Sequence, residues 1–133
     1  MFLKKTTTFL IFLVIFFSSI AKVYSIEPDI FVQSTVNRAS EALNDKFSKE
    51  EKIAKLKAIA KETVDITGIG FYTLGSHRKN INDEQKKEYS NLFEQYFLKS
   101  FASRLAEYSN PEIEVLSKKK LNENYTMVSS ILV

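Results

Sequence analysis

The sequence contains no cysteine, one histidine (His77), three glycines and two prolines. Without cysteine, the chain has no disulfide framework, no thiolate zinc or iron–sulfur site and no cysteine nucleophile. The scarcity of glycine and proline argues against a loop-rich or collagen-like chain. The 44% hydrophobic and 26% charged residues argue against wholesale disorder, and 133 residues suit a single domain.

Positive charge in excess is confined to one end of the chain. The net charge is +3, and Lys4, Lys5 and Lys22 all lie within the first 25 residues, which contain no acid. The remainder is therefore neutral. A neutral chain lacks the basic groove that supplies most nucleic-acid affinity, so we expect no nucleic-acid partner.

Residues 1–25 are predicted to be a cleaved secretory signal peptide. Lys4 and Lys5 precede an apolar run at 9–17, which is shorter than the roughly 20 residues that span a bilayer. Small residues permit cleavage after Ala21 or after Ser25, and Ser25 is favoured; an uncleaved anchor is the alternative. Export of residues 26–133 without any cysteine is typical of a Gram-negative periplasm reached through a Sec-type signal.

Two helices are predicted next. A stripe of apolar residues at three- and four-residue spacings predicts a helix from Asp29 to about Asp45. Ser48 and Glu51 form a capping-box pattern that opens a second helix. Its lysines are expected to form a solvated face, with a docking surface as the alternative: Lys49, Lys52, Lys55, Lys57 and Lys61.

All three glycines fall between residues 65 and 82. Asp65 is predicted to cap a short helix, and Gly75 is predicted to end it in the left-handed conformation. Gly68 and Gly70 form only a G-x-G, without the further glycine or lysine of a phosphate-binding loop. We therefore expect them to permit close packing of the short helix against a neighbour.

Asn82 and Gln85 form a second capping pattern, which opens a long helix that Asn110-Pro111 is predicted to end. One face of that helix is aromatic, and the sheet that follows is expected to cover it. Strands are predicted at 112–116 and 125–133, around a polar turn at 118–124. Because the sequence stops within an apolar run, we expect the sheet to be incomplete and the chain to be the front part of a longer protein; a natural end at Val133 is the alternative.

No pattern in the sequence predicts catalysis, a metal site or a cofactor. His77 has no partner in an H-x-x-E or H-E-x-x-H arrangement, and no G-x-S-x-G motif is present. A further alternative, an α+β enzyme with a cone-shaped pocket, would require His77, Asp65 or Tyr72 to converge in that pocket. We therefore expect a protein that is not an enzyme.

The spacing of these features resembles the MlaC/toluene-tolerance family of periplasmic phospholipid carriers. The resemblance rests on Leu74-Gly75, Lys79, Asn82, Gln85, Tyr89, Phe93, Tyr96, Phe97, Phe101, Leu105 and Tyr108. It implies an α+β fold in which N-terminal helices pack on a twisted antiparallel sheet, with an apolar cavity between the layers. It also implies phospholipid as cargo, and two partners: an outer-membrane lipoprotein complex and the lipid-binding subunit of an inner-membrane ABC transporter.

The residues that line the cavity are predicted from their positions in the apolar stripes of the helices, and not from any motif that contacts lipid. The predicted lining residues are Phe71, Leu74, Leu92, Phe93, Tyr96, Phe97, Phe101 and Leu105. Arg78 and Lys79 are predicted to contact a headgroup or a partner, although Arg78 stands where the family usually has an aromatic residue. The alternative interpretation is a periplasmic structural or adaptor module in which the aromatic stripe is ordinary core.

Overall fold

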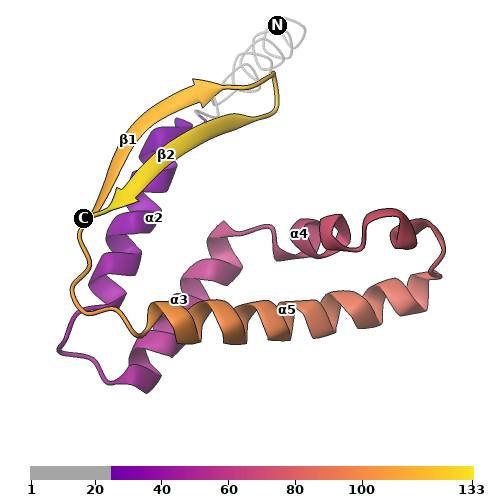
Figure 1. Cartoon of the computed structure of the whole chain (residues 1–133), viewed down its shortest axis with the longest axis horizontal. Coiled ribbons are helices and arrows are strands. Elements are labelled where there is room, and N and C mark those ends of the chain that lie inside the picture. The colour runs from indigo at the N-terminus through magenta and orange to yellow at the C-terminus, as the bar shows by residue number, and fades with distance from the viewer. Residues whose placement is uncertain (1–24) are drawn as a thin grey trace, which may run out of the picture.

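The computed structural model of the chain describes residues 25–133 (Figure 1). The elements, in order, are α2 (Pro28–Ala42), α3 (Lys49–Thr63), α4 (Ile66–Thr73), the 3₁₀ helix η1 (Gly75–Lys79), α5 (Asp83–Leu105), β1 (Ile113–Lys120) and β2 (Thr126–Leu132). The predicted α+β class is confirmed, and so is the incomplete sheet, because β1 and β2 form a single antiparallel hairpin. The predicted signal peptide, apart from Ser25, lies outside the described residues.

Both predicted capping boxes are present. At the start of α3, the Ser48 hydroxyl accepts a hydrogen bond from the Glu51 amide at 3.2 Å, and the Glu51 carboxylate accepts one from the Ser48 amide at 2.8 Å. Asn82 and Gln85 make the same reciprocal pair at the start of α5, at 2.9 and 3.0 Å. These bonds satisfy backbone N–H groups that have no partner within the helix.

The short helix α4 also begins and ends as predicted. The Asp65 carboxylate accepts a hydrogen bond from the Gly68 amide at 2.9 Å, and Gly75 has a φ of +55° just beyond the helix end. A Cβ atom added to Gly70 would lie 2.9 Å from Cδ1 of Phe93. Gly70 therefore allows α4 to approach α5 closely, as the sequence predicted.

The core lies where the helices meet. Ala42, Leu43, Leu56, Ala102 and Ala106 form one buried cluster among α2, α3 and the C-terminal end of α5. A second cluster joins α3, α4 and α5 and consists of Ala60, Ile66 and Leu98. The alanines let the helices approach closely, and the two leucines of the first cluster fill most of its volume.

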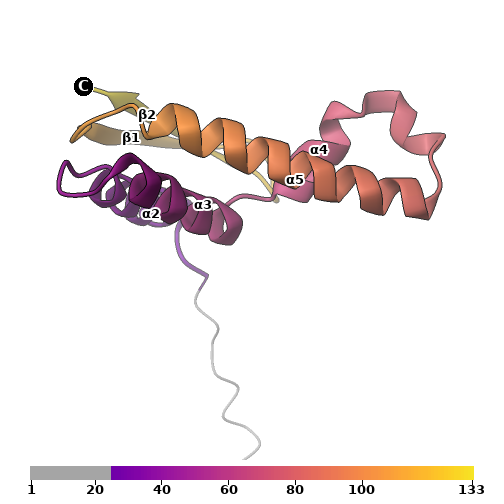
Figure 2. The ribbon, with the colours of Figure 1, turned by 90° about the horizontal axis from the view of Figure 1, so that it is seen from below.

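The placement of the sheet corrects the prediction for the aromatic face of α5. The hairpin packs against α2, whereas α3 and α4 pack against α5. Figures 1 and 2 show the hairpin and α2 at one end of the molecule, with α4 and α5 extending together toward the other. Helices α3 and α4 thus cover part of the aromatic face, because the connection through Gly75 folds α4 back along α5.

Three predicted boundaries were wrong. Helix α2 ends at Ala42 rather than near Asp45, because the Asn44 side chain accepts a hydrogen bond from the Lys46 amide at 3.0 Å and forms a turn. Helix α5 ends at Leu105 rather than at Asn110, and β1 continues through Lys118–Lys120, which pair with Val128–Thr126. Hydrophobic spacing did not reveal the ends of α2 and β1, because the first depends on a local polar contact and the second on strand pairing.

Lys52 was also predicted wrongly, because it lies in the interior and not on a solvated face. Only 6% of the residue is exposed. Its ammonium nitrogen lies 3.6 Å from an Asp45 carboxylate oxygen and 3.5 Å from the Tyr108 carbonyl oxygen. The long aliphatic stem is buried while the charged end reaches polar groups, as is common for lysine.

Asn110 connects the α2–α3 loop to the segment before β1. Its side-chain amide donates to an Asp45 carboxylate oxygen at 2.6 Å and its side-chain oxygen accepts from the Asp45 amide at 3.3 Å, while its φ is +46°. We expect Asn110→Ala to lower the free energy of unfolding by about 2 kcal/mol, through lost hydrogen bonds and left-handed strain. Asn110→Gly removes the strain and should cost about half as much. Urea unfolding measures both; equal losses would contradict the contribution from strain.

Candidate functional site

Four aromatic side chains form a ladder along α5. Tyr89, Phe93, Phe97 and Phe101 follow one another at four-residue intervals, and successive ring centroids are 5.8, 6.2 and 5.5 Å apart. The angles between successive ring planes are 26° or less, so the rings are stacked. Stacked pairs of this kind are worth about 0.5–1.5 kcal/mol each beyond the area they bury.

The ladder is partly core and partly surface. Phe93, Phe97 and Phe101 are half-buried and pack against the Ala60–Ile66–Leu98 cluster. The Tyr89 hydroxyl lies 3.2 Å from the Gly70 carbonyl oxygen and 2.8 Å from the Thr73 hydroxyl, which holds α4 on this end of the ladder. The rings therefore stabilise the fold and also present apolar surface.

The other predicted lining residues do not share one environment. Phe71 and Leu74 are half-buried in and just after α4. Leu92 and Tyr96 are exposed by 58% and 69%, respectively. Leu105 packs on the first core cluster and lies near the hairpin. The structure thus brings Phe93, Phe97 and Phe101 together, but it does not gather all eight residues around one cavity.

An apolar pocket lies where the hairpin meets the C-terminal end of α5. Its volume is about 240 Å³. The lining residues come from α2's end, α5, the following turn and both strands: Leu43, Leu105, Tyr108, Pro111, Ile113, Ser130, Ile131 and Leu132. The pocket therefore lies between the helices and the sheet, where an apolar cavity was expected, and Leu105 is the predicted lining residue that it contains.

Most of this lining was not predicted as a binding site. In the sequence, Leu43 and Tyr108 belong to helical stripes of apolar residues, and Ile131 and Leu132 belong to the predicted strand 125–133. The available signal was the combination of an uncharged second strand with apolar residues just after the long helix. The sequence could not show that these segments meet, because they lie far apart in the chain.

Arg78 and Lys79 lie at the opposite end of α5 from this pocket. Both are exposed on η1, directly before α5 begins, and α5 is 23 residues long. At 1.5 Å per residue the helix spans roughly 34 Å. The two cations are thus separated from the pocket by about the length of the helix (Figure 1).

An ion-pair cluster fixes the hairpin to the start of α2. The Lys118 ammonium lies 2.8 Å from a Glu27 carboxylate oxygen and 2.8 Å from an Asp29 carboxylate oxygen. Hydrogen bonding to Lys118 lowers the pKa of Asp29 below its ordinary value of 3.8, and the two acids raise the pKa of Lys118. The cluster attaches β1, whose Ile113 lines the apolar pocket, to the start of α2.

We expect this cluster to make the hairpin's attachment sensitive to acid. Since the pKa of Asp29 is lower in the folded state, its stabilising effect is complete above about pH 4 and is lost as the pH falls through the lowered pKa. Asp29→Asn should therefore reduce the urea midpoint at pH 6, and the difference from the wild type should shrink at pH 3. Asp83→Asn, which breaks an i,i+3 pair within α5, is the control. If Asp29→Asn lowered the urea midpoint by the same amount at pH 6 and at pH 3, the lowered pKa of Asp29 would not explain the loss of stability.

The three residues named for a possible enzymatic pocket do not converge on one pocket. His77 is exposed on η1, Tyr72 is 82% exposed, and the Asp65 carboxylate caps α4. Among residues 25–133, no three His, Asp or Glu side chains are grouped so that they could hold a metal ion. Within the same range, no helix is both long and apolar enough to cross a membrane.

Comparison with known proteins identifies the family. The family model described as MlaC protein matches residues 33–133, which is well over half of the chain. The chain belongs to the MlaC family. Searches of the curated proteins and of the solved structures find no match. MlaC-family proteins are periplasmic phospholipid-binding carriers, and the match covers all the elements that form the aromatic ladder and the apolar pocket.

Proposed function

We propose that this MlaC-family chain carries phospholipid through the periplasm between the outer and inner membranes, as the soluble component of an ABC transport system that maintains outer-membrane lipid asymmetry. The observation that supports this function is the apolar pocket between hairpin and helices, in a chain whose family binds phospholipid. The role involves no catalytic step and no cofactor, since the lipid is moved without being changed.

The size of the pocket sets what it can hold. At about 30 Å³ for each water-sized group, 240 Å³ accommodates roughly eight methylene groups. Complete burial of eight methylenes is worth about 6 kcal/mol relative to water, which is an upper limit for a pocket that is open to solvent. One pocket of this size takes part of one acyl chain, and the half-buried rings of Phe93, Phe97 and Phe101 supply further apolar surface. The bound phospholipid then leaves by exchange with another apolar site rather than by release into water.

The proposed partners are the lipid-binding subunit of an inner-membrane ABC transporter and an outer-membrane lipoprotein complex. Arg78 and Lys79 are candidates for contact with such a partner. A headgroup attached to an acyl chain in the hairpin pocket lies too far away to reach them, because the length of α5 separates the two.

The test is to purify the full-length protein from cells and analyse an organic extract by mass spectrometry. We expect phospholipid in a reproducible molar ratio to protein. An unrelated protein of similar size, expressed and extracted in the same way, controls for lipid carried over from membranes. An extract containing no more phospholipid than this control would contradict the proposal.

The alternative is a periplasmic structural or adaptor module, and the packing of the ladder favours it. Phe93, Phe97 and Phe101 contact the core cluster, as ordinary core residues do. This alternative predicts that removing lipid leaves the melting temperature unchanged. A carrier that binds lipid only when folded is instead stabilised by it, so its melting temperature should fall on delipidation.

A further inference from the structure

The hairpin has two faces, and α2 packs on one of them. Directly opposite residues in an antiparallel pair project from the same face of the sheet. Lys118 therefore shares a face with its partner Val128, which is half-buried. This inner face packs on α2, and its Lys118 ammonium lies 2.8 Å from carboxylate oxygens of Glu27 and Asp29. The residues that alternate with these form the outer face of the hairpin.

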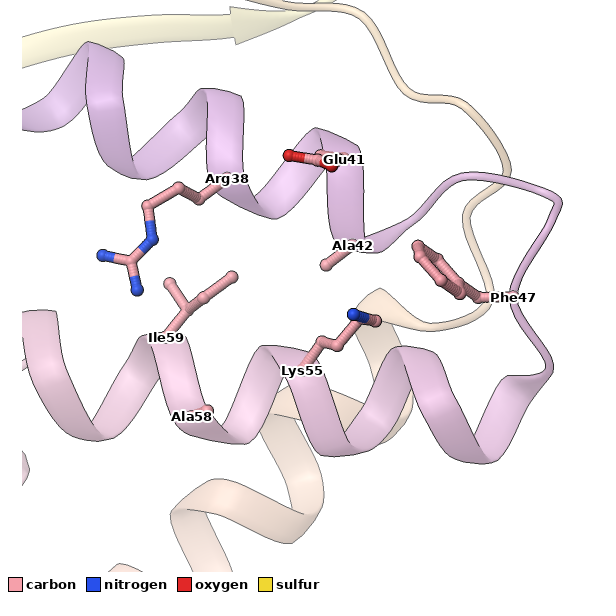
Figure 3. Close-up of a pocket in the computed structure, with 7 residues that line it drawn as sticks. All are labelled: Arg38, Glu41, Ala42, Phe47, Lys55, Ala58 and Ile59. Carbon is pink, nitrogen blue, oxygen red and sulfur yellow. The ribbon is translucent and has the colours of Figure 1, made fainter.

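Helix α2, which supports the hairpin, is itself fixed to α3. Ala42 and Leu56 join the two helices within one buried cluster, and two Arg38 nitrogens donate to the Glu62 carboxylate oxygens at 3.0 and 2.5 Å. Figure 3 shows Ala42 of α2 and Ile59 of α3 on facing sides of the pocket of about 270 Å³ that these helices form. The outer face of the hairpin is thus held on the side away from α2 and needs little rearrangement to meet a partner.

The outer face consists of two opposed pairs of residues on either side of Ser129. Glu114 lies opposite Ile131, and Lys119 lies opposite Met127. Met127 and Ile131 are 48% and 47% exposed, and Glu114 and Lys119 are exposed as well. Among the ion pairs of residues 25–133, none includes Glu114 or Lys119. The outer face therefore presents apolar residues on β2 and two charges of opposite sign on β1.

A bulge in β1 places the two charges on the same face. Between Val115 and Lys118, β1 has one residue more than the facing part of β2. That extra residue changes the alternation of side chains, so Lys119 projects from the same face as Glu114. In an uninterrupted strand the two side chains would project from opposite faces. Their partners on β2 lie two positions before and two positions after Ser129, so the charges are symmetric about the middle of the face.

We propose that the outer face binds the outer face of a second copy of this chain, with a two-fold axis that crosses the strands at Ser129. This symmetry stacks β1 on β1 and places the base of one hairpin over the tip of the other. Glu114 of each copy then meets Lys119 of the other, and Met127 meets Ile131 in the same way. A two-fold axis along the strands would instead place each charge over an apolar residue, so the charges select the first arrangement.

The size of the face limits the strength of this dimer. At about 3.4 Å per residue, the seven residues of β2 span roughly 24 Å, and the face is two strands wide. Such an interface falls at the small end of specific contacts, where association is transient. We therefore expect a dissociation constant on the order of 100 µM.

The test is sedimentation equilibrium of the protein purified from cells, over about 10 µM to 1 mM. We expect the average mass to rise from that of a monomer toward that of a dimer, both before and after removal of lipid. A mass that stays monomeric over this range would overturn the proposal. A dimer that formed only with lipid present would also overturn it, since lipid would then join the two copies.

Charge reversal locates the contact. Glu114→Lys should weaken the dimer at least fivefold, because two-fold symmetry turns both ion pairs into repulsion, and Lys119→Glu should do the same. The double variant Glu114→Lys/Lys119→Glu should return the affinity to within about twofold of the wild type. Glu88→Lys makes the same charge change at an exposed position of α5 and should leave the dimer unchanged. Single variants that associate normally, or a double variant as weak as they are, would overturn the proposal.

Met127→Glu separates association from lipid binding. It places a carboxylate against Ile131 of the second copy, so we expect the dimer to be lost. Met127 does not line the hairpin pocket, so the bound phospholipid should stay at the level of the wild type. If dimer and phospholipid were lost together, the outer face would belong to the lipid site and the proposed dimer would be wrong.

Discussion

We expect Ile131→Glu to lower the amount of phospholipid that co-purifies with the chain by at least tenfold. Ile131 lines the apolar pocket, and an ionised carboxylate there is costly to surround with acyl chain. A tenfold loss corresponds to only about 1.4 kcal/mol, which is less than the usual cost of burying a charge. Because the side chain is 47% exposed, the carboxylate remains solvated in the lipid-free protein, so the fold should persist. Mass spectrometry of extracted lipid per mole of protein measures the effect.

Met127→Glu is the matched control for this experiment. Met127 lies on the same strand and is 48% exposed, but it does not line the pocket. We expect it to retain phospholipid at the level of the wild type. If both variants lost lipid equally, the hairpin pocket would not be the binding site. If neither lost lipid, the acyl chains would have to bind elsewhere, for example on the aromatic ladder.

The second large effect concerns stability. We expect Leu56→Ala to lower the free energy of unfolding by about 3 kcal/mol, within the range measured for buried leucines. Leu56 is 1% exposed and belongs to the cluster that joins α2, α3 and α5, so its loss leaves a cavity where three helices meet. A domain of this size has a total stability of roughly 5–15 kcal/mol, so this variant loses a large part of it.

Urea unfolding provides the measurement, with Leu92→Ala as the control. Leu92 is 58% exposed on α5, and its truncation should change the free energy of unfolding by no more than about 0.5 kcal/mol. A similar loss for the two leucines would show that the helices do not pack around Leu56. The slope of free energy against urea should stay constant, since neither change alters the surface exposed on unfolding.

The aromatic ladder explains why the candidate lining was difficult to assign from the sequence. Helical spacing shows that Phe93, Phe97 and Phe101 share a face, but it does not show what covers that face. The structure places α4 over one end of it, and the close approach at Gly70 depends on the absence of a side chain there. The residues of α5 that are most deeply buried are instead Leu98 and Ala102, which the aromatic pattern obscured.

Features within a few residues of one another were determined by the sequence alone. The caps at Ser48, Asp65 and Asn82, and the left-handed Gly75, depend on hydrogen bonds or sterics that act within one helical turn. The joint spacing from Leu74 to Tyr108 likewise sufficed to indicate the MlaC family, which the family match then established.

Only the tertiary structure decided which surfaces meet. It placed the hairpin on α2 rather than over the aromatic face, buried Lys52, and assembled one pocket from Leu43, Leu105 and Ile131. The physical reason is that an apolar face gains nearly the same free energy against any apolar partner, because hydrophobic burial is non-directional. The choice among partners therefore depends on how all the elements pack together, which local spacing does not record.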